Sequence, residues 1–352
     1  MPKKKLKIGI IGVGGIAQAH MQGYAKVSDK AELVAFCDTI EERAEKGAKE
    51  FGSPNAKVFT DYRKMLEMED LDAVDICTPN KFHAPIAIDA LKAGKHVYCE
   101  KPMAMNTEEA EAMVRTAKET GKKLSVGYPS RYSDDAQLLK KMISAGEFGD
   151  IYFAEAAAVR RRGVPTWGVF LSKELQGGGP LIDIATHILD LILWLMGDYS
   201  QPVAVLGTSY KKIAPLGGYN IWGPWDPEKF EVEDSAFGMV RLESGATVIV
   251  KSSWALNTEE PHTSYLCGTK GGAVLGAGST KIFTEAHNRL IDLVPVPTHS
   301  QGSLIDREIA DWVDCLIKDR EPLVKAEEAA QVTRILDLIY KSADAGKAIN
   351  LI

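Results

Sequence analysis

The chain has 352 residues, of which 45% are hydrophobic and 26% charged, and its formal net charge is −6. This length exceeds one typical hydrophobic core, so we expect two domains, and the composition excludes a disordered or fibrous protein. The acidic balance argues against a nucleic-acid partner, because proteins that bind nucleic acid usually carry a basic surface.

The cysteines and the N-terminus bear on location. Five scattered cysteines without a Cys-x-x-Cys pair favour a reducing compartment and form no metal-ligand cluster. The lysine-rich N-terminus and the apolar run after it have the outline of a secretory leader, but four glycines between residues 9 and 15 interrupt that run. No other stretch is long and apolar enough to span a bilayer. We therefore expect a cytoplasmic protein with no membrane partner and no metal.

A glycine-rich loop follows the first predicted strand. Residues 7–13 read as a short buried strand, and a G-x-G-x-x-G/A pattern with Ala17 in its last place comes directly after it. Helix-forming residues then begin, so a pyrophosphate would rest on a helix N-terminus. A strand, a glycine loop and a helix in this order predict a dinucleotide site. The residues expected to line it are Gly12, Gly14, Gly15 and Ile16.

The second predicted strand, Glu32–Cys37, ends at Asp38. An acidic side chain at this point accepts hydrogen bonds from the adenosine ribose and repels a 2′-phosphate, so Asp38 favours NAD over NADP. Asp38 also precedes a predicted helix, and a helix N-cap is its structural alternative. The two roles are compatible.

Strands and helices alternate from there to residue 127. The strands Leu71–Thr78 and His96–Glu100 are each followed by a helical pattern. Such alternation predicts an α/β fold with a doubly wound parallel sheet. The composition changes after residue 127, so we place a dinucleotide-binding domain at 1–127 and a substrate-binding and oligomerisation domain at 128–352.

The strand His96–Glu100 ends abruptly at Lys101 and Pro102. Proline cannot donate to a sheet ladder and biases the residue before it away from helix, so Lys101 should stand at the carboxyl end of the strand. Ligands of open α/β sheets bind outside these ends, where an ammonium can bind a substrate oxygen. On these residues alone, a solvated surface lysine is the favoured alternative.

The second part of the chain reads as α+β. Residues 203–210, 235–242 and 246–254 have strand patterns, which predict an antiparallel sheet. Two amphipathic helices, Leu304–Ile317 and Ala326–Ala343, are expected to pack on this sheet or on the first domain. Trp312 and Cys315 should lie in the core.

Between these regions, three glycines at 177–179 precede Pro180, which suits a helix start. On that helix Asp183 and His187 are four residues apart and share a face. A carboxylate beside an imidazole can work as an acid–base unit, because it orients the ring and stabilises its cation. A helix-surface pair worth a few tenths of a kcal/mol is an equal alternative. Asp190, on nearly the same side, is interpreted as structural.

Several loop residues allow two interpretations. Arg160, Arg161 and Arg162 could bind a carboxylate or phosphate, although a run of charges more often forms a solvated face. Trp167, Trp222 and Trp225 lie in segments rich in glycine and proline, where indoles can stack on sugar rings or line an interface. Core packing is the alternative for each. We select Trp167 as a candidate substrate contact.

Three motifs in order resemble the Gfo/Idh/MocA oxidoreductase family, named for glucose–fructose oxidoreductase, inositol dehydrogenase and a rhizopine-catabolism protein. They are the glycine loop, Cys77-Thr78-Pro79-Asn80 with His83 shortly after, and Glu100-Lys101-Pro102. Gly-Gly-Gly followed by Asp-x-x-x-His looks like a second hallmark of the family. The resemblance spans nearly the whole chain. It implies a Rossmann domain, a second domain with a large, open, mostly antiparallel sheet, and a homodimer or homotetramer.

The resemblance also implies residue roles. It places the catalytic set Lys101, Asp183 and His187 together at the domain interface, beside the nicotinamide. Residues expected along the cofactor are Thr78, Asn80, His83, Glu100 and Lys101. Residues expected at the substrate are Lys101, Tyr128, Arg131, Asp183 and His187.

The expected activity is hydride transfer between NAD and a hydroxyl carbon of a sugar, sugar derivative or cyclitol. His187 would take the hydroxyl proton, Lys101 would stabilise the alkoxide, and Asp183 would hold substrate and imidazole in register. One alternative is a glycoside hydrolase that uses NAD for transient ring oxidation. Another is a non-catalytic dinucleotide or sugar sensor, which would have no need of an acid–base pair.

Overall fold

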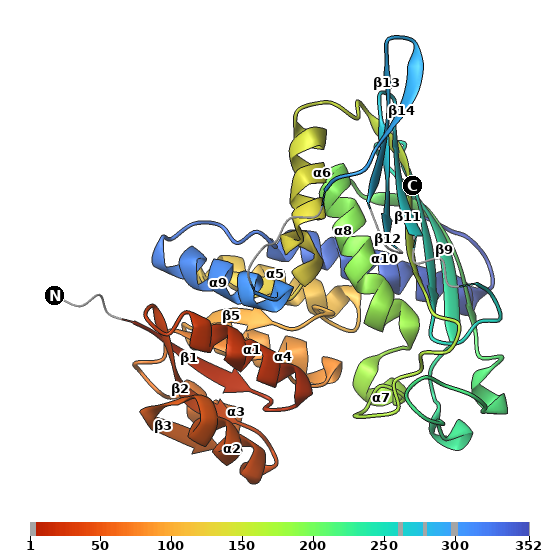
Figure 1. The fold of residues 1–352 in the computed structure, drawn as a ribbon. Coiled ribbons are helices and arrows are strands. Elements are labelled where there is room, and N and C mark those ends of the chain that lie inside the picture. The colour runs from red at the N-terminus through yellow and green to blue at the C-terminus, as the bar shows by residue number, and fades with distance from the viewer. Residues whose placement is uncertain (1–4, 260–262, 277–279, 297–301, 352) are drawn as a thin grey trace. The chain divides into compact units, whose positions relative to one another are not determined.

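The computed structural model describes residues 5–259, 263–276, 280–296 and 302–351. The chain divides into two compact units (Figure 1). The first comprises Met1–Tyr132 and Gln301–Ala330, and the second comprises Ser133–Ser300 and Gln331–Ile352. We expected one domain boundary, at residue 127, and therefore placed residues 301–330 in the second domain. In the structure this segment belongs to the first unit.

The first unit is built on a six-stranded parallel sheet with the order β3-β2-β1-β4-β5-β6. This confirms the predicted doubly wound sheet. The strand order reverses between β1 and β4, and ligands of such sheets bind at this switch point, outside the carboxyl ends of the strands. The strands are β1 Leu6–Ile11, β2 Ala31–Cys37, β3 Gly52–Phe59, β4 Ala73–Ile76, β5 His96–Cys99 and β6 Leu124–Val126.

The helices of the first unit have sequence-encoded ends. The Asn106 side chain caps α5, and Gly121 ends that helix in the left-handed region. Ser303 and Asp306 form a reciprocal capping box on α9. The helices are α1 Gly15–Lys26, α2 Glu41–Phe51, α3 Tyr62–Leu66, α4 His83–Lys92, α5 Thr107–Thr120 and α9 Leu304–Ile317, with short 3₁₀ turns at Asn80–Phe82 and Pro129–Tyr132.

Helix α9 belongs to the first unit because its inner face completes the core there. Ile309, Trp312 and Cys315 are buried in one cluster with Ile8 and Tyr24, so the predicted burial of Trp312 and Cys315 is confirmed. Apolar burial of this kind contributes about 25 cal/mol per Å² removed from water.

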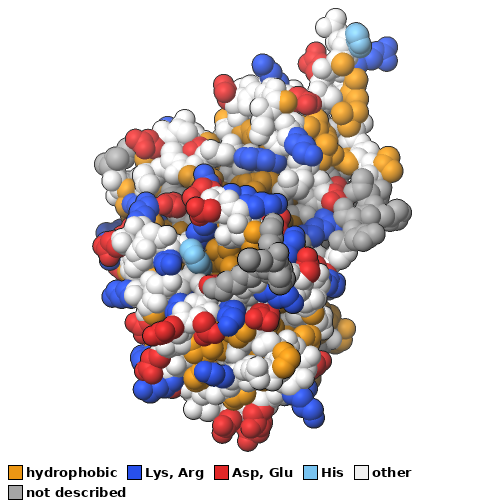
Figure 2. All heavy atoms as spheres, turned by 90° about the vertical axis from the view of Figure 1, so that its left-hand side faces the viewer, with side chains coloured by type: hydrophobic (Ala, Val, Ile, Leu, Met, Phe, Trp, Pro, Cys, Tyr) orange, Lys and Arg blue, Asp and Glu red, His pale blue; other side chains and the backbone are white. Residues whose placement is uncertain are grey.

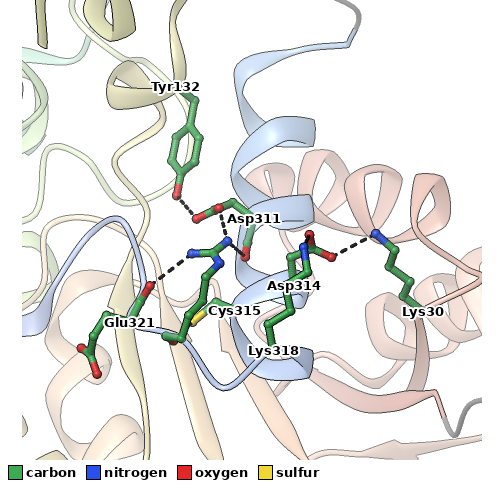
Figure 3. Close-up of polar contacts among 8 residues, drawn as sticks. Lys30, Tyr132, Asp311, Asp314, Cys315, Lys318 and Glu321 are labelled. Carbon is green, nitrogen blue, oxygen red and sulfur yellow. Dashed lines mark hydrogen bonds and ion pairs between the residues drawn. The ribbon is translucent and has the colours of Figure 1, made fainter. Parts of the chain in front are cut away.

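Polar contacts also fasten α9 (Figure 3). The hydroxyl of Tyr132 donates to Asp311 at 3.0 Å, and the guanidinium of Arg320 pairs with the same carboxylate. Nearly one turn further along the helix, Asp314 accepts from Lys30 at 3.0 Å and from Lys318 at 2.7 Å. Amphipathic spacing predicted the helix, but the packing partner had to be seen in the structure.

The second unit contains a nine-stranded sheet with the order β14-β13-β12-β11-β7-β10-β9-β8-β15. Neighbouring strands are antiparallel except for β7 and β10, which confirms the expected mostly antiparallel sheet. The strands are β7 Ile151–Val159, β8 Pro202–Tyr210, β9 Ser235–Leu242, β10 Thr247–Ser253, β11 Thr263–Gly268, β12 Gly272–Gly276, β13 Lys281–Ala286, β14 Arg289–Leu293 and β15 Ile349–Asn350.

Helices cover one face of this sheet. Helix α8 lies against β7 and β11, and α6 packs on α8 (Figure 1). The helical elements are α6 Asp134–Ser144, α7 Lys173–Gln176, a π-helical turn at Leu181–Ala185 and α8 Thr186–Met196, with 3₁₀ turns at Ala214–Leu216 and Pro227–Lys229. Helix α10, Ala326–Ala345, begins in the first unit and continues in the second.

One helical run, Lys173–Met196, meets the length and hydropathy of a membrane span, with a mean hydropathy of 1.5. This corrects our expectation that no such stretch exists. Its apolar window is 72% buried within the fold, and a core helix of a folded domain has the same composition.

Charged groups are mixed on the face drawn in Figure 2, where Lys and Arg lie among Asp and Glu.

Candidate active site

The predicted dinucleotide loop joins β1 to α1. Gly12 has φ +86°, and a Cβ there would lie 2.7 Å from the carbonyl oxygen of Cys77, so only glycine fits. A Cβ on Gly14 or Gly15 would meet no atom within 4 Å. Gly14 is the N-cap of α1, whose first turn carries no acidic side chain. An open backbone cradle at a helix N-terminus fits a pyrophosphate. Ile16 is 41% exposed beside it.

Asp38 braces the same loop from the end of β2. Its Oδ2 accepts from the backbone N–H of Val13 at 2.8 Å, and its Oδ1 accepts from the N–H of Ile40 at 2.9 Å. Ile40, not Asp38, is the N-cap of α2, so the capping alternative is wrong. A carboxylate oxygen accepts more than one hydrogen bond, which leaves Asp38 able to bind a ribose hydroxyl.

His83 ties two of the sequence motifs together. Its Nδ1 lies 2.8 Å from the carbonyl oxygen of Pro102, and its Nε2 lies 2.8 Å from that of Thr78. Burial lowers the pKa of His83, so the neutral ring donates to only one of these carbonyls at a time. The ring is 1% exposed, which makes it a brace for the loops. Asn80 is also buried, and the buried hydroxyl of Thr78 has no hydrogen-bond partner among the described residues.

Lys101 stands two residues beyond the end of β5, as the sequence predicted, and is partly exposed. Its peptide bond to Pro102 is cis. The backbone N–H of Lys101 donates to Glu100 Oε2 at 3.1 Å. The other carboxylate oxygen of Glu100 lies 2.9 Å from Nε2 of His20. Glu100 is 8% exposed, so its predicted contact with the cofactor would be limited to a small surface.

Sequence reasoning missed His20. It lies in the buried stripe of α1, three residues after Ala17, and a polar residue in such a stripe was the available signal. His20, Asp75 and Cys77 bring their ligand atoms close enough to hold a metal ion. Burial raises the pKa of the Cys77 thiol to about 12, and the protonated thiol donates to Asp75 Oδ1 at 3.4 Å. We interpret the group as a hydrogen-bonded cluster.

Tyr128 and Arg131, expected at the substrate, are both fully buried. The guanidinium of Arg131 pairs with Glu328 at 2.6 Å and donates to the carbonyl oxygen of Leu323 at 3.0 Å. These contacts join the 3₁₀ turn at Pro129–Tyr132 to the segment before α10 and to the first turn of that helix. We therefore assign Arg131 to the structure of the first unit and no longer expect it to touch substrate.

In the second unit, Glu233 fixes the start of the helix that carries the other candidate residues. Its carboxylate accepts from the N–H groups of Gly179 at 2.8 Å and Leu181 at 3.2 Å, and from the hydroxyl of Tyr340 at 2.7 Å. A Cβ on Gly179 would lie 2.2 Å from the carbonyl oxygen of Glu233, which explains the glycine. Burial raises the pKa of Glu233. No pattern in the sequence indicates that Glu233 is the partner of this helix start.

Asp183 lies in a π-helical turn rather than in the regular α-helix we expected, and His187 follows in α8. π-turns are rare and frequently mark functional sites. Oδ2 of Asp183 accepts from the indole N–H of Trp254 at 3.2 Å. Both Asp183 and His187 are partly exposed, whereas Asp190 is fully buried, which fits its structural interpretation.

An aromatic cluster extends from Trp254 to the surface. Phe170 contacts Trp254, with ring centroids 6.5 Å apart, and Trp167 at 6.0 Å. Trp167 meets Trp222 edge-to-face at 5.0 Å, and the guanidinium of Arg160 lies 5.2 Å from the Trp222 ring. Trp167 is 52% and Trp222 40% exposed.

The other loop residues have structural partners. Trp225 is a core residue whose indole N–H donates to Ala214. Arg162 donates to Asn257 at 2.7 Å on the surface. The structure thus assembles Glu100 with Lys101 in the first unit and Asp183 with Trp254 in the second. The expectation that Lys101 meets Asp183 and His187 stays a proposal.

Comparisons with known proteins agree with this architecture. Residues 6–128 match the model of an oxidoreductase family with an NAD-binding Rossmann fold, and residues 136–274 match the GFO/IDH/MocA C-terminal domain. The chain is 35% identical to D-glucoside 3-dehydrogenase of Escherichia coli (strain K12), covering 100% of this chain and 99% of that protein.

Two further relatives are levoglucosan dehydrogenases. One, from Pseudarthrobacter phenanthrenivorans, is 31% identical and covers 77% of this chain and 73% of its own length. A solved structure of a levoglucosan dehydrogenase in complex with NADH has a TM-score of 0.84 at 25% identity, covering 99% of this chain and 100% of that chain. This chain therefore belongs to the Gfo/Idh/MocA oxidoreductases and is related to sugar dehydrogenases with NAD-binding Rossmann domains.

Proposed function

We propose that this protein is an NAD-dependent dehydrogenase that oxidises a ring hydroxyl of a glucoside or a related sugar or cyclitol. The observation that carries the proposal is Lys101, a partly exposed ammonium at the carboxyl end of β5 whose backbone is held by Glu100. Ligands of this sheet class bind at that edge. The substrate class follows from the glucoside and levoglucosan dehydrogenases among the relatives.

The proposed chemistry assigns one role to each catalytic residue. A bound nicotinamide would supply the acceptor for the hydride of the carbinol carbon. The imidazole of His187 takes the proton of the hydroxyl as that carbon is oxidised. The ammonium of Lys101 donates to the same oxygen and stabilises its alkoxide character. Asp183, anchored by Trp254 at 3.2 Å, orients the substrate. In the reverse direction, the same groups reduce a ketone.

The preference for NAD over NADP rests on Asp38. Its carboxylate is already held in place by the N–H groups of Val13 and Ile40. A fixed negative charge next to the adenosine ribose accepts hydrogen bonds from two hydroxyls and repels a 2′-phosphate.

Trp167 is the proposed substrate-stacking residue. Its indole is half exposed and is fixed by Trp222 on one side and Phe170 on another. The buried side chain of Asn220 ties its loop to the segment before Trp167, because it bonds to both the N–H and the carbonyl of Val164. A fixed indole presents a flat apolar surface on which a sugar ring can rest.

We also propose a cytoplasmic homo-oligomer. All five cysteines are free, which fits a reducing compartment. On the face of the large sheet opposite α8, Leu206, Met239 and Tyr265 are each at least 40% exposed. The strand register sets them in one mostly apolar row, with Ile249 of β10 and Glu155 of β7 between Met239 and Tyr265. An exposed apolar row of this kind suits association of two copies. Sedimentation velocity tests it, and a monomer at micromolar concentration would contradict it.

The experiment that tests the function is a screen for NADH formation. Purified protein and NAD are mixed with methyl glucosides, levoglucosan, aldoses and inositols, and reduced cofactor is followed by absorbance. Oxidation of a sugar with stoichiometric NADH supports the dehydrogenase. Cleavage of a glycoside without net NADH would replace it with the hydrolase, and NAD binding without any turnover would favour the sensor.

A further inference from the structure

A buried charged cluster in the first unit has no part in the chemistry above. His20 projects from α1 between two carboxylates. Its Nδ1 lies 2.9 Å from Asp75 Oδ2, and its Nε2 lies 2.9 Å from Glu100 Oε1. His20 and Asp75 are fully buried, and Glu100 is 8% exposed. The imidazole therefore bridges the end of β4 and the end of β5, the two strands that lead to the ligand edge of the sheet.

The bridge requires a doubly protonated ring. A carboxylate only accepts hydrogen bonds, so two carboxylates on the two ring nitrogens need two N–H donors. Burial lowers the pKa of His20, but the charge of Asp75 and the hydrogen bond to it outweigh burial and hold that pKa well above its ordinary value. Other titratable groups that face the ring or the carboxylates are Cys77, Tyr24, Tyr98 and Glu308.

The bridge continues to Lys101 through the second oxygen of Glu100. Oε2 of Glu100 accepts from the backbone N–H of Lys101 at 3.1 Å, while Oε1 is held by His20. The two oxygens of the Glu100 carboxylate thus have different partners. One is bonded to the buried ring of His20, and the other is bonded to the backbone of Lys101, whose side chain is the candidate catalytic ammonium. Rotation of the carboxylate would break both contacts.

We propose that His20 is a positioning residue: as a buried imidazolium between Asp75 and Glu100, it fixes the Glu100 carboxylate and through it the backbone of Lys101. Without the imidazolium, Asp75 and Glu100 lose their shared counter-charge, and a buried carboxylate without its cation tends to take up a proton or turn towards another donor. For Glu100, the nearest such donor along the sequence is the ammonium of Lys101, which would then be drawn away from its proposed role. The inference rests on the proposed function, because it serves the role given to Lys101.

Two measurements test the bridge without any sugar. In protein labelled with ¹⁵N-histidine, the nitrogen shifts of His20, assigned by comparison with His20→Gln, are expected to show both nitrogens protonated at pH 8. Hydrogen exchange of the Lys101 amide is expected to be at least tenfold faster in His20→Gln than in wild type. A neutral His20 ring at pH 8, or unchanged exchange, overturns the bridge.

Kinetics with NAD and methyl glucoside test the positioning. His20→Gln is expected to lower kcat at least tenfold and to change the dissociation constant of NADH less than threefold, since the loop at Gly12–Gly15 is untouched. The control is Thr116→Ala, which removes another buried polar side chain, on α5 and away from the ligand edge. It should change kcat less than twofold. A kcat for His20→Gln within twofold of wild type overturns the proposal.

A second variant decides the matter if His20→Gln does not fold. Asp75→Asn keeps the ring but removes one of its carboxylates, so the pKa of His20 falls. Activity is expected to be lost at a pH at least one unit lower than in wild type, both alone and in a Glu308→Gln background. An unshifted profile overturns the positioning role. If wild type oxidises no sugar, the proposed function fails, while the two measurements without sugar still decide whether the bridge exists.

Discussion

The carboxylate of Asp38 accepts a hydrogen bond from the backbone N–H of Val13 at 2.8 Å, which locks the end of β2 to the glycine loop. The residue expected to read the adenosine ribose is thus also a brace for the phosphate loop. Its charge and its acceptor role can be separated by substitution, since asparagine keeps one acceptor oxygen and alanine keeps none.

Substituting Asp38 is expected to relax the cofactor preference. Asp38→Asn should raise kcat/KM for NADP relative to NAD about tenfold or more, because a charge repulsion at about 4 Å is worth roughly 1–4 kcal/mol near a surface. Asp38→Ala should show the same ratio with a further loss of affinity for both cofactors. Initial rates with each cofactor give the ratio. An unchanged ratio in both variants would remove Asp38 from the ribose site.

Glu308 should make stability depend on pH. It is 1% exposed, and burial raises its pKa from 4.5 to about 8. Between these values the folded state holds a proton that the unfolded chain has released, so stability falls as pH rises from about 4.5 to 8, by at most about 5 kcal/mol. Glu308→Gln cannot titrate.

The thermal midpoint of Glu308→Gln relative to wild type is therefore expected to rise by several degrees between pH 5 and pH 8. Melting curves of both proteins at each pH give the difference. A constant offset between the two proteins across this range would show that Glu308 does not titrate there.

Arg131 should matter for folding and not for substrate affinity. Arg131→Met removes the guanidinium that pairs with Glu328, and breaking a buried pair typically costs about 3–5 kcal/mol. The Glu328 side chain is 18% exposed, which places the cost at the lower end. The double variant Arg131→Met with Glu328→Gln should recover part of the loss. Denaturation and KM are measured on the same samples. A normal midpoint with a raised KM would return Arg131 to the substrate site.

Substitution of Trp167 or Trp222 should raise KM for glycosides more than KM for small polyols. Trp167→Ala is expected to raise KM for phenyl glucoside about two- to twelvefold while leaving kcat within twofold, because stacking contributes about 0.5–1.5 kcal/mol. Trp222→Ala should act in the same direction more weakly, through the support it gives Trp167. Tyr219→Ala, an exposed residue of the neighbouring loop, is the control. Equal effects of all three would indicate general disturbance of the loops.

Local pattern was sufficient for much of the fold. Strand periodicity, the glycine loop and Pro102 located β1, β2, β5 and Lys101 because these signals are local in the chain. Contacts between segments distant in the sequence could not be predicted from these local patterns. Helix α9 was predicted with its observed bounds, Leu304–Ile317, but its amphipathic pattern states only that one face is buried and not which unit covers it.

In the candidate site, too, residues with a local motif could be predicted and residues that act through long-range contacts could not. Sequence motifs indicated Lys101, Asp183 and His187 as candidates. Glu233 acts through contacts with residues distant in sequence and had no local signature, and the one signal for His20 was its place as a polar residue in the buried stripe of α1. Arg131 was expected at the substrate, where an exposed arginine is usual, whereas its guanidinium is buried and paired with Glu328. The π-turn at Leu181–Ala185 was also beyond periodicity, since its start depends on the carboxylate of Glu233.

The most direct test of the account follows hydrogen itself. Methyl glucoside deuterated on its ring carbons is incubated with NAD and either wild type or Lys101→Ala, and the cofactor is analysed by mass spectrometry. The account predicts one deuterium in the NADH formed by wild type, and a rate at least 100-fold lower in Lys101→Ala, since one lost donor to a developing oxyanion costs about that much. Deuterated NADH formed equally fast by Lys101→Ala, or none formed by wild type with any sugar that binds, would contradict it.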